Sequence, residues 1–128
     1  MIPRYRAWDK IHKTMYKVDD IMSIDFGESE ISVKTLFFDQ INRYDFDDIV
    51  LMQSTGLTDK NGKEIFEGDI LGTKDGLLNG VVKFNIDLGM WANSLIRYNN
   101  FERLCNIANS REIIGNIWED GELLDGEN

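Results

Sequence analysis

Alternating apolar and polar residues run through most of the chain and predict β-strands. The most regular alternation covers residues 30–38, where one face would carry Ile31, Val33, Thr35 and Phe37. Residues 15–26 alternate in part, and residues 26–29 between the two segments have the composition of a turn. The pattern therefore predicts a β-hairpin with one buried face.

Six other segments have the apolar and β-branched composition that pleated sheets favour. They are residues 4–8, 49–53, 69–74, 80–86, 90–98 and 111–118. Gly115 interrupts the last segment, and we expect it at a bulge or a close contact. Residues 39–48 are polar and acidic, and we expect a loop there.

Glycine-containing turns separate the strands in the second half of the chain. Seven of the eleven glycines lie between Gly56 and Gly89, which favours tight turns over helices. Asn61-Gly62 is typical of a hairpin turn. We therefore predict a mainly β protein, with an N-terminal strand-rich lobe in residues 1–53 and a second domain in residues 54–128.

One short helix is predicted near the C-terminus. Its spacing of i, i+3, i+4 and i+7 is formed by Phe101, Leu104, Cys105 and Ala108. Asn99 is a suitable N-cap, and Glu102 has the position of a capping-box residue. This helix would place the Cys105 thiol on a buried face, where we expect it to be inert.

Composition and charge exclude several classes of protein. The apolar content of 42% is sufficient for a folded core, and no apolar run approaches the roughly 20 residues of a membrane helix. The single cysteine excludes an internal disulfide, and we expect a cytoplasmic protein. The net charge of −9 disfavours non-specific binding to nucleic acid.

The sequence contains no catalytic or metal-binding motif that we can assign. His12 is the only histidine, no nucleophile elbow accompanies it, and we expect it to be exposed in a loop. A calcium loop beginning at Asp59 would need Gly where Glu64 stands and Glu where Ile70 stands. The acidic cluster within residues 45–48 is better explained as a solvated loop. We therefore predict no catalytic residues, no metal and no cofactor.

Aromatic residues are the remaining candidates for a binding surface. Trp91 follows Gly89-Met90, and we expect it to be an exposed contact residue. Tyr98 and Trp8 are further binding candidates. The alternative, which we favour for Trp8 and Trp118, is that these rings fill the core.

Three segments in the same order resemble the YopX family, whose members are small uncharacterised proteins of phages and prophages. They are YRAWDK at residues 5–10, the TGL and DKNGKEIFEGDI segments within residues 52–71, and IIGNIWEDGELL at residues 113–124. The resemblance implies a mainly β fold whose C-terminal domain, residues 54–128, is a small SH3-type barrel. It implies no activity, cofactor or catalytic residue.

These observations favour a non-enzymatic phage or prophage accessory protein in the cytoplasm of the bacterial host cell. We expect it to act through contacts with an unidentified host or phage protein, or as a homo-oligomer, without a membrane partner. The alternative is a small-barrel module associated with nucleic acid, whose binding surface would be the basic N-terminal stretch with Tyr5, Trp8 and Tyr16. An enzyme is the least favoured class.

Overall fold

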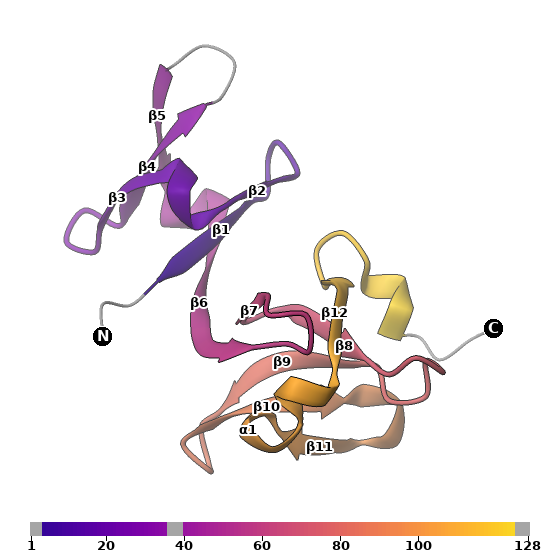
Figure 1. Cartoon of the computed structure of the whole chain (residues 1–128). Helices are drawn as coiled ribbons and strands as arrows, with labels where there is room; N and C mark the ends of the chain where they lie inside the picture. The colour runs from indigo at the N-terminus through magenta and orange to yellow at the C-terminus, as the bar shows by residue number, and fades with distance from the viewer. Residues whose placement is uncertain (1–3, 36–39, 125–128) are drawn as a thin grey trace. The chain divides into compact units, whose positions relative to one another are not determined.

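The computed structural model describes residues 4–35 and 40–124 and is mainly β (Figure 1). The chain divides into two compact units, Met1–Gln53 and Ser54–Asn128. Each unit has its own buried cluster of apolar side chains. The two units are described separately below.

The N-terminal unit begins with the antiparallel pair β1 and β2, followed by a three-stranded antiparallel sheet in the order β3-β4-β5. Short 3₁₀ turns precede β3 and follow β5. The strands are β1 (Tyr5–Asp9), β2 (Thr14–Tyr16), β3 (Ile21–Asp25), β4 (Glu30–Thr35) and β5 (Gln40–Asp45). The 3₁₀ turns are Val18–Asp20 and Phe46–Asp48.

The predicted hairpin is confirmed, because β3 pairs with β4 across the turn. Ile31 and Val33 are fully buried, as their alternation indicates; the side chain of Thr35 and residue 37 lie outside the described part. The register of β3 shifts between Ile21 and Ser23. This bulge lets Ile21 and Ile24 both pack against the same core, although they are an odd number of residues apart.

The prediction of a loop at residues 39–48 is wrong for most of that segment. Residues 40–45 form β5, which pairs with β4 along its whole length. Exposed residues alternate with the half-buried Asn42 and Tyr44. The polar composition concealed a strand with one solvated face, which pairing with β4 stabilises.

Strand β6 (Ile49–Thr58) contributes to both units. Residues 49–53 pair with β1 in the N-terminal unit. Ser54 and Thr58 pair with β7 (Glu64–Phe66) in the C-terminal unit, with a register shift between them. The turn from β6 to β7 includes Gly62, whose φ of 82° lies in the left-handed region that glycine adopts without strain.

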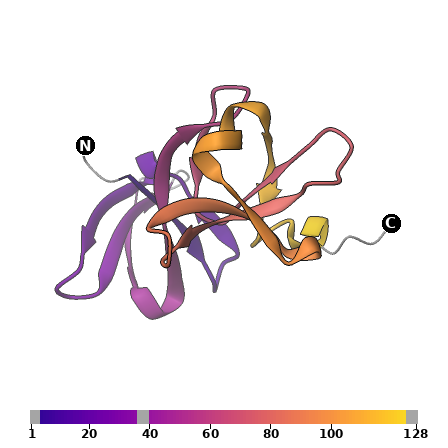
Figure 2. The same ribbon diagram turned by 90° about the horizontal axis from the view of Figure 1, so that it is seen from below.

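A five-stranded antiparallel sheet in the order β11-β10-β9-β8-β12 forms most of the C-terminal unit. The sheet curls into a half-barrel (Figure 2), and its likeness to an SH3-type barrel stays a prediction. Gly115 lies at the bulge where β12 meets β8, as expected. The strands are β8 (Asp69–Gly72), β9 (Gly80–Asn85), β10 (Met90–Leu95), β11 (Asn100–Arg103) and β12 (Glu112–Asn116).

The predicted helix is present only as the single turn α1 (Leu104–Ile107), followed by a 3₁₀ turn at Ala108–Ser110. Residues 100–103, the expected first turn, instead form β11, because they pair with β10. Asn99 is therefore not its N-cap; it has a φ of 48° and ends the 3₁₀ turn Ile96–Tyr98. Cys105 is exposed, which contradicts its predicted burial. The short α1 buries only Leu104. A final 3₁₀ turn occupies Gly121–Leu124.

Candidate functional site

Strand register in the C-terminal sheet brings two basic side chains to one face. Ala92 of β10 is paired with Lys83 of β9 on one side and with Arg103 of β11 on the other. Directly paired residues point to the same face of a sheet. Lys83 and Arg103 therefore flank the small side chain of Ala92, and both are exposed.

This face carries an open groove of about 380 Å³. Phe101 contributes exposed aromatic surface to it, with 41% of the residue accessible to solvent. Phe84 also belongs to the lining, but it follows Lys83 in β9, so its side chain points to the opposite face, where its ring meets Trp91. Amide and hydroxyl groups lie among the apolar ones. The lining includes Lys83, Phe84, Ser94, Ile96, Asn100 and Phe101. Such a combination suits a ligand with both apolar and hydrogen-bonding groups.

The groove is locally basic on an acidic protein. Lys83 and Arg103 form no ion pair within the described part of the chain. Arg97, in the 3₁₀ turn after β10, lies over the ring of Tyr98 with 5.6 Å between its guanidinium carbon and the ring centroid. Because the net charge of the chain is −9, Lys83 and Arg103 form a local region that attracts negative charge.

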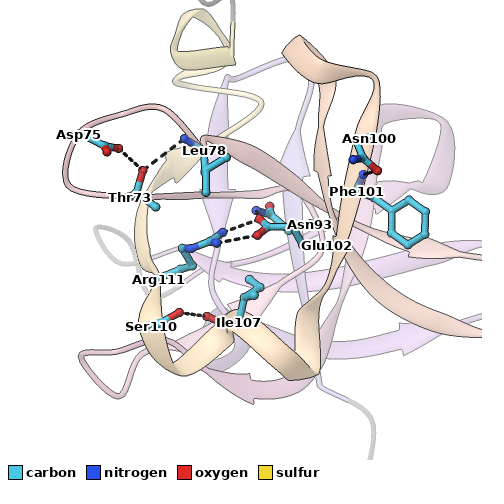
Figure 3. Close-up of polar contacts among 10 residues, drawn as sticks. All are labelled: Thr73, Asp75, Leu78, Asn93, Asn100, Phe101, Glu102, Ile107, Ser110 and Arg111. Atoms are coloured by element: carbon cyan, nitrogen blue, oxygen red, sulfur yellow. Dashed lines mark hydrogen bonds and ion pairs between the residues drawn. The ribbon is translucent and has the colours of Figure 1, made fainter.

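The opposite face of β11 is held by a mostly buried ion pair. The Arg111 guanidinium donates two hydrogen bonds to the Glu102 carboxylate, at 2.5 and 2.6 Å (Figure 3). The bond from Arg111 lowers the pKa of Glu102 against the opposing effect of burial, and the same bond raises the pKa of Arg111. Glu102 belongs to β11, and Arg111 directly precedes β12. Because β11 and β12 are the two edge strands of this sheet, the ion pair links its opposite edges. The curl of the sheet brings these edges within reach of each other.

Asn93 completes this inner polar cluster. Its side-chain amide donates to Glu102 at 3.3 Å, while its buried Oδ1 has no hydrogen-bond partner in the structure. Gly80 packs directly against it, so that a Cβ at Gly80 would lie 2.7 Å from Oδ1. The glycine is required by close packing there. This cluster fixes β11 from inside the half-barrel, while Arg103 on the same strand points to the opposite face, which carries the groove.

A second polar cluster lies in the N-terminal unit, around the fully buried Asp9. Its Oδ1 accepts the backbone N–H groups of Ile11 and His12, both at 2.9 Å. Its Oδ2 is 2.8 Å from Nδ1 of His12 and accepts the Tyr16 hydroxyl at 2.7 Å. The Tyr16 hydroxyl is also hydrogen-bonded to that of Tyr44, at 3.2 Å.

These contacts explain the ionisation of the cluster. Burial acts to raise the pKa of Asp9, but the hydrogen bonds from His12, Tyr16 and Ile11 together lower it. Burial, with the hydrogen bonds to Tyr44 and Asp9, raises the pKa of Tyr16. Two of the donors are backbone N–H groups of the β1–β2 turn, so the Asp9 carboxylate closes that turn. His12 is exposed, as predicted, and its ring is oriented by the carboxylate.

Asp59 performs a similar task in the C-terminal unit. Its carboxylate accepts the backbone N–H groups of Asn61, Lys63 and Ile113 at 2.9, 2.9 and 3.0 Å. Burial opposes these bonds, which together lower the pKa of Asp59. The acidic loop that resembles a calcium site is thus a turn closed by a backbone-bound carboxylate. In the described part of the chain, no three His, Cys, Asp or Glu side chains are grouped to hold a metal ion.

Comparison with known proteins identifies the family. The family model described as YopX protein matches residues 4–125. The chain belongs to the YopX family. No curated protein sequence matches the chain.

Two solved structures extend the comparison. The chain is 30% identical to protein EF1440 from Enterococcus faecalis, covering 98% of this chain and 99% of that one, with a TM-score of 0.68. It is also similar in fold to protein yopX from Bacillus subtilis, at 19% identity, 95% and 98% coverage and a TM-score of 0.61. The family assignment expected from the three sequence segments is confirmed.

The predicted binding residues of this YopX-family protein are not brought together at the groove. Trp8 is buried, with 5% of its surface accessible, which agrees with the core position favoured for it above. Trp91 is half-buried and packs against the core of the C-terminal unit, which corrects its predicted exposure. Its ring meets Phe84 edge to face, with centroids 5.2 Å apart. Tyr98 is exposed but outside the groove lining.

The preferred core position of Trp118 is also wrong, because 37% of this residue is accessible. The residues that line the groove were missed for different reasons. Lys83 lies in a correctly predicted strand, and the alternation along that strand placed it on the face opposite Val82 and Phe84. Phe101 was assigned to a helix and Arg103 was left unassigned, and only the pairing of β11 with β10 places both on the sheet face that carries the groove. Arg103 lies outside the groove lining itself. None of the described helices is long and apolar enough to cross a membrane.

Proposed function

We propose that this YopX-family protein is a non-enzymatic accessory protein of a phage or prophage, and that its C-terminal unit binds a segment of a partner protein. The segment is extended, acidic and partly apolar, and it lies in the groove over β9, β10 and β11. The observation that carries this proposal is the placement of Lys83 and Arg103 on either side of Ala92.

Charge complementarity selects an acidic segment. Two unpaired cations near each other on an acidic protein attract carboxylates and disfavour other basic proteins. The exposed ring of Phe101, on the same face, supplies apolar contact area. Aromatic and arginine side chains are the residue types that dominate binding energy at protein interfaces.

Nucleic acid is the competing ligand class, because phosphates also seek basic grooves. Two of the three rings expected on the N-terminal surface, Trp8 and Tyr16, are buried and offer little area for base stacking, while Tyr5 is half-buried. The net charge of −9 opposes phosphate at longer range. A protein segment is therefore the better-supported ligand.

Fluorescence anisotropy with defined probes tests the proposal. The probe is a labelled peptide about seven residues long in which Glu and Val alternate, compared with a Lys–Val peptide and a single-stranded oligonucleotide. We expect the Glu–Val peptide alone to bind. The double variant Lys83→Glu/Arg103→Glu should weaken binding by about a hundredfold, since two charged contacts are reversed.

A matched control variant has the same change in net charge, but at two lysines outside the groove lining. Lys60 and Lys74 are exposed in the turns after β6 and β8, and Lys60→Glu/Lys74→Glu should weaken binding only a few-fold. Equal losses in the two double variants would mean that total charge, not the groove, attracts the peptide. Binding of the oligonucleotide but not the peptide would replace the proposal with the nucleic-acid alternative.

Self-association of this protein is a separate proposal from peptide binding. Light scattering at working concentration measures it directly. A mass equal to that of one chain, 14.8 kDa, would contradict it.

A further inference from the structure

The outer edge of β11 offers backbone groups for pairing. In the part of the chain that the structure describes, β11 is a terminal strand of its sheet and pairs only with β10. Along an antiparallel strand, residues alternately direct their N–H and C=O groups toward one neighbour and then toward the other side. One set of backbone groups on β11 therefore faces away from β10.

The hydrogen bond of Phe101 identifies which set this is. The Phe101 N–H donates to Oδ1 of Asn100 at 2.8 Å (Figure 3). We infer that this donor faces away from β10, since an N–H directed toward β10 would be used in the ladder. By alternation, the N–H of Arg103 also faces away from β10. The two outward donors belong to Phe101 and Arg103, whose side chains share the face of the groove.

Resting on the proposed function, we propose that the acidic segment binds as an added antiparallel strand along β11. Its backbone carbonyl replaces Oδ1 of Asn100 as the acceptor of the Phe101 N–H. The Asn100 side chain thus protects the edge while no partner is bound, as polar side chains commonly do on edge strands. Strand addition to an exposed sheet edge is a general mode of peptide recognition.

Register determines where the acidic side chains of the added strand lie. A residue directly opposite Phe101 or Arg103 exchanges backbone hydrogen bonds with it and points to the same face. A carboxylate opposite Arg103 would therefore meet its guanidinium beside the groove. In a peptide in which acidic and apolar residues alternate, the backbone N–H and C=O groups of the acidic residues then form hydrogen bonds with β11. The backbone groups of the apolar residues point away from β11.

Selective N-methylation of the Glu–Val peptide tests this arrangement. One peptide is methylated on every Glu nitrogen and the other on every Val nitrogen, so the two have the same side chains and the same number of methyl groups. We expect methylation at Glu to weaken binding at least about tenfold, because it removes donors to β11. Methylation at Val should change the dissociation constant by no more than about twofold.

The outcomes separate the two proposals. If the unmodified peptide binds and both methylated peptides bind equally well, the segment docks through side chains, and strand addition is wrong while the proposed function stands. Greater sensitivity to methylation at Val would also overturn the register. If the unmodified peptide does not bind, the proposed function itself fails, and strand addition fails with it.

A substitution at Asn100 gives an independent test, in which peptide binding should become tighter instead of weaker. Asn100 is exposed, so Asn100→Ala should fold normally and free the Phe101 N–H. We expect this variant to bind the unmodified Glu–Val peptide about fivefold more tightly, since no internal bond must be broken first. Ser23→Ala, at an exposed polar residue of β3 outside the groove lining, serves as the control and should leave binding unchanged. Unchanged or weaker binding by Asn100→Ala would contradict the role of Asn100 as edge protection.

Discussion

Each unit of the protein holds a buried or nearly buried carboxylate, but the two carboxylates are stabilised differently. Asp9 in the N-terminal unit is bonded to backbone N–H groups, a tyrosine hydroxyl and a histidine, all within a short stretch of chain. Glu102 in the C-terminal unit is paired with the guanidinium of Arg111, which lies on a different element. The contacts of Asp9 close a local turn. The Glu102–Arg111 ion pair instead connects the two edges of the five-stranded sheet.

This difference determines what each cluster contributes. Several weak, mostly neutral donors share the charge of Asp9, so the loss of one leaves the others in place. Glu102 and Arg111 depend on each other, and removal of one leaves an uncompensated charge inside the half-barrel. Because Glu102 and Arg103 are neighbours on β11, the ion pair also positions the proposed binding surface.

The largest effect is expected from Arg111→Met, which leaves the Glu102 carboxylate without its cation. We expect it to lower the free energy of unfolding by about 3 kcal/mol, measured by urea denaturation. Adding Glu102→Leu should recover part of the loss, since both charges are then removed. If the double variant is less stable than Arg111→Met alone, the carboxylate has another role in the unit.

Asp9→Ala should have the next largest effect, about 2 kcal/mol, because it removes four hydrogen bonds around one turn. Amide hydrogen exchange can follow each unit separately. We expect faster exchange in residues 10–16 and little change in residues 100–112. Equal acceleration in both segments would show that the two clusters are not energetically separate.

Tyr16→Phe removes a single donor from Asp9 and should cost about 1 kcal/mol. The ring of Tyr16 still stacks on Tyr44, whose centroid is 5.8 Å away. His12→Ala, which removes the exposed donor, should cost less than Tyr16→Phe. A larger cost for His12→Ala would mean that the histidine, and not the buried hydroxyl, holds the carboxylate in place.

Mild acidification should have the smallest effect on both units. Asp9, Asp59 and Glu102 have pKa values below their usual range in the folded protein. Their contribution to stability is therefore complete above the unfolded-state values near pH 4 and is lost as pH falls through the lower folded values. Urea denaturation should give nearly equal free energies at pH 7 and pH 5, and a decline below about pH 4. A free energy of unfolding that increases as the pH falls would contradict the lowered pKa values of these three carboxyl groups.

The sequence by itself determined features that depend on neighbouring residues. Alternation located the hairpin of β3 and β4, and Asn61-Gly62 located the turn before β7, because side-chain period and glycine conformation are local properties. The three resembling segments correctly indicated the family. The burial of Ile31 and Val33 followed from alternation for the same reason.

Only the tertiary structure decided which polar or ambiguous segments became strands. Residues 40–45 and 100–103 are strands because β4 and β10 pair with them, and no local pattern contains that partner. Strand pairing also set Lys83 and Arg103 on either side of Ala92, exposed Cys105 and brought Glu102 to Arg111 instead of a helix cap. Cross-strand neighbours are fixed by register between distant segments, so the binding surface follows from the fold and not from the order of residues along the chain.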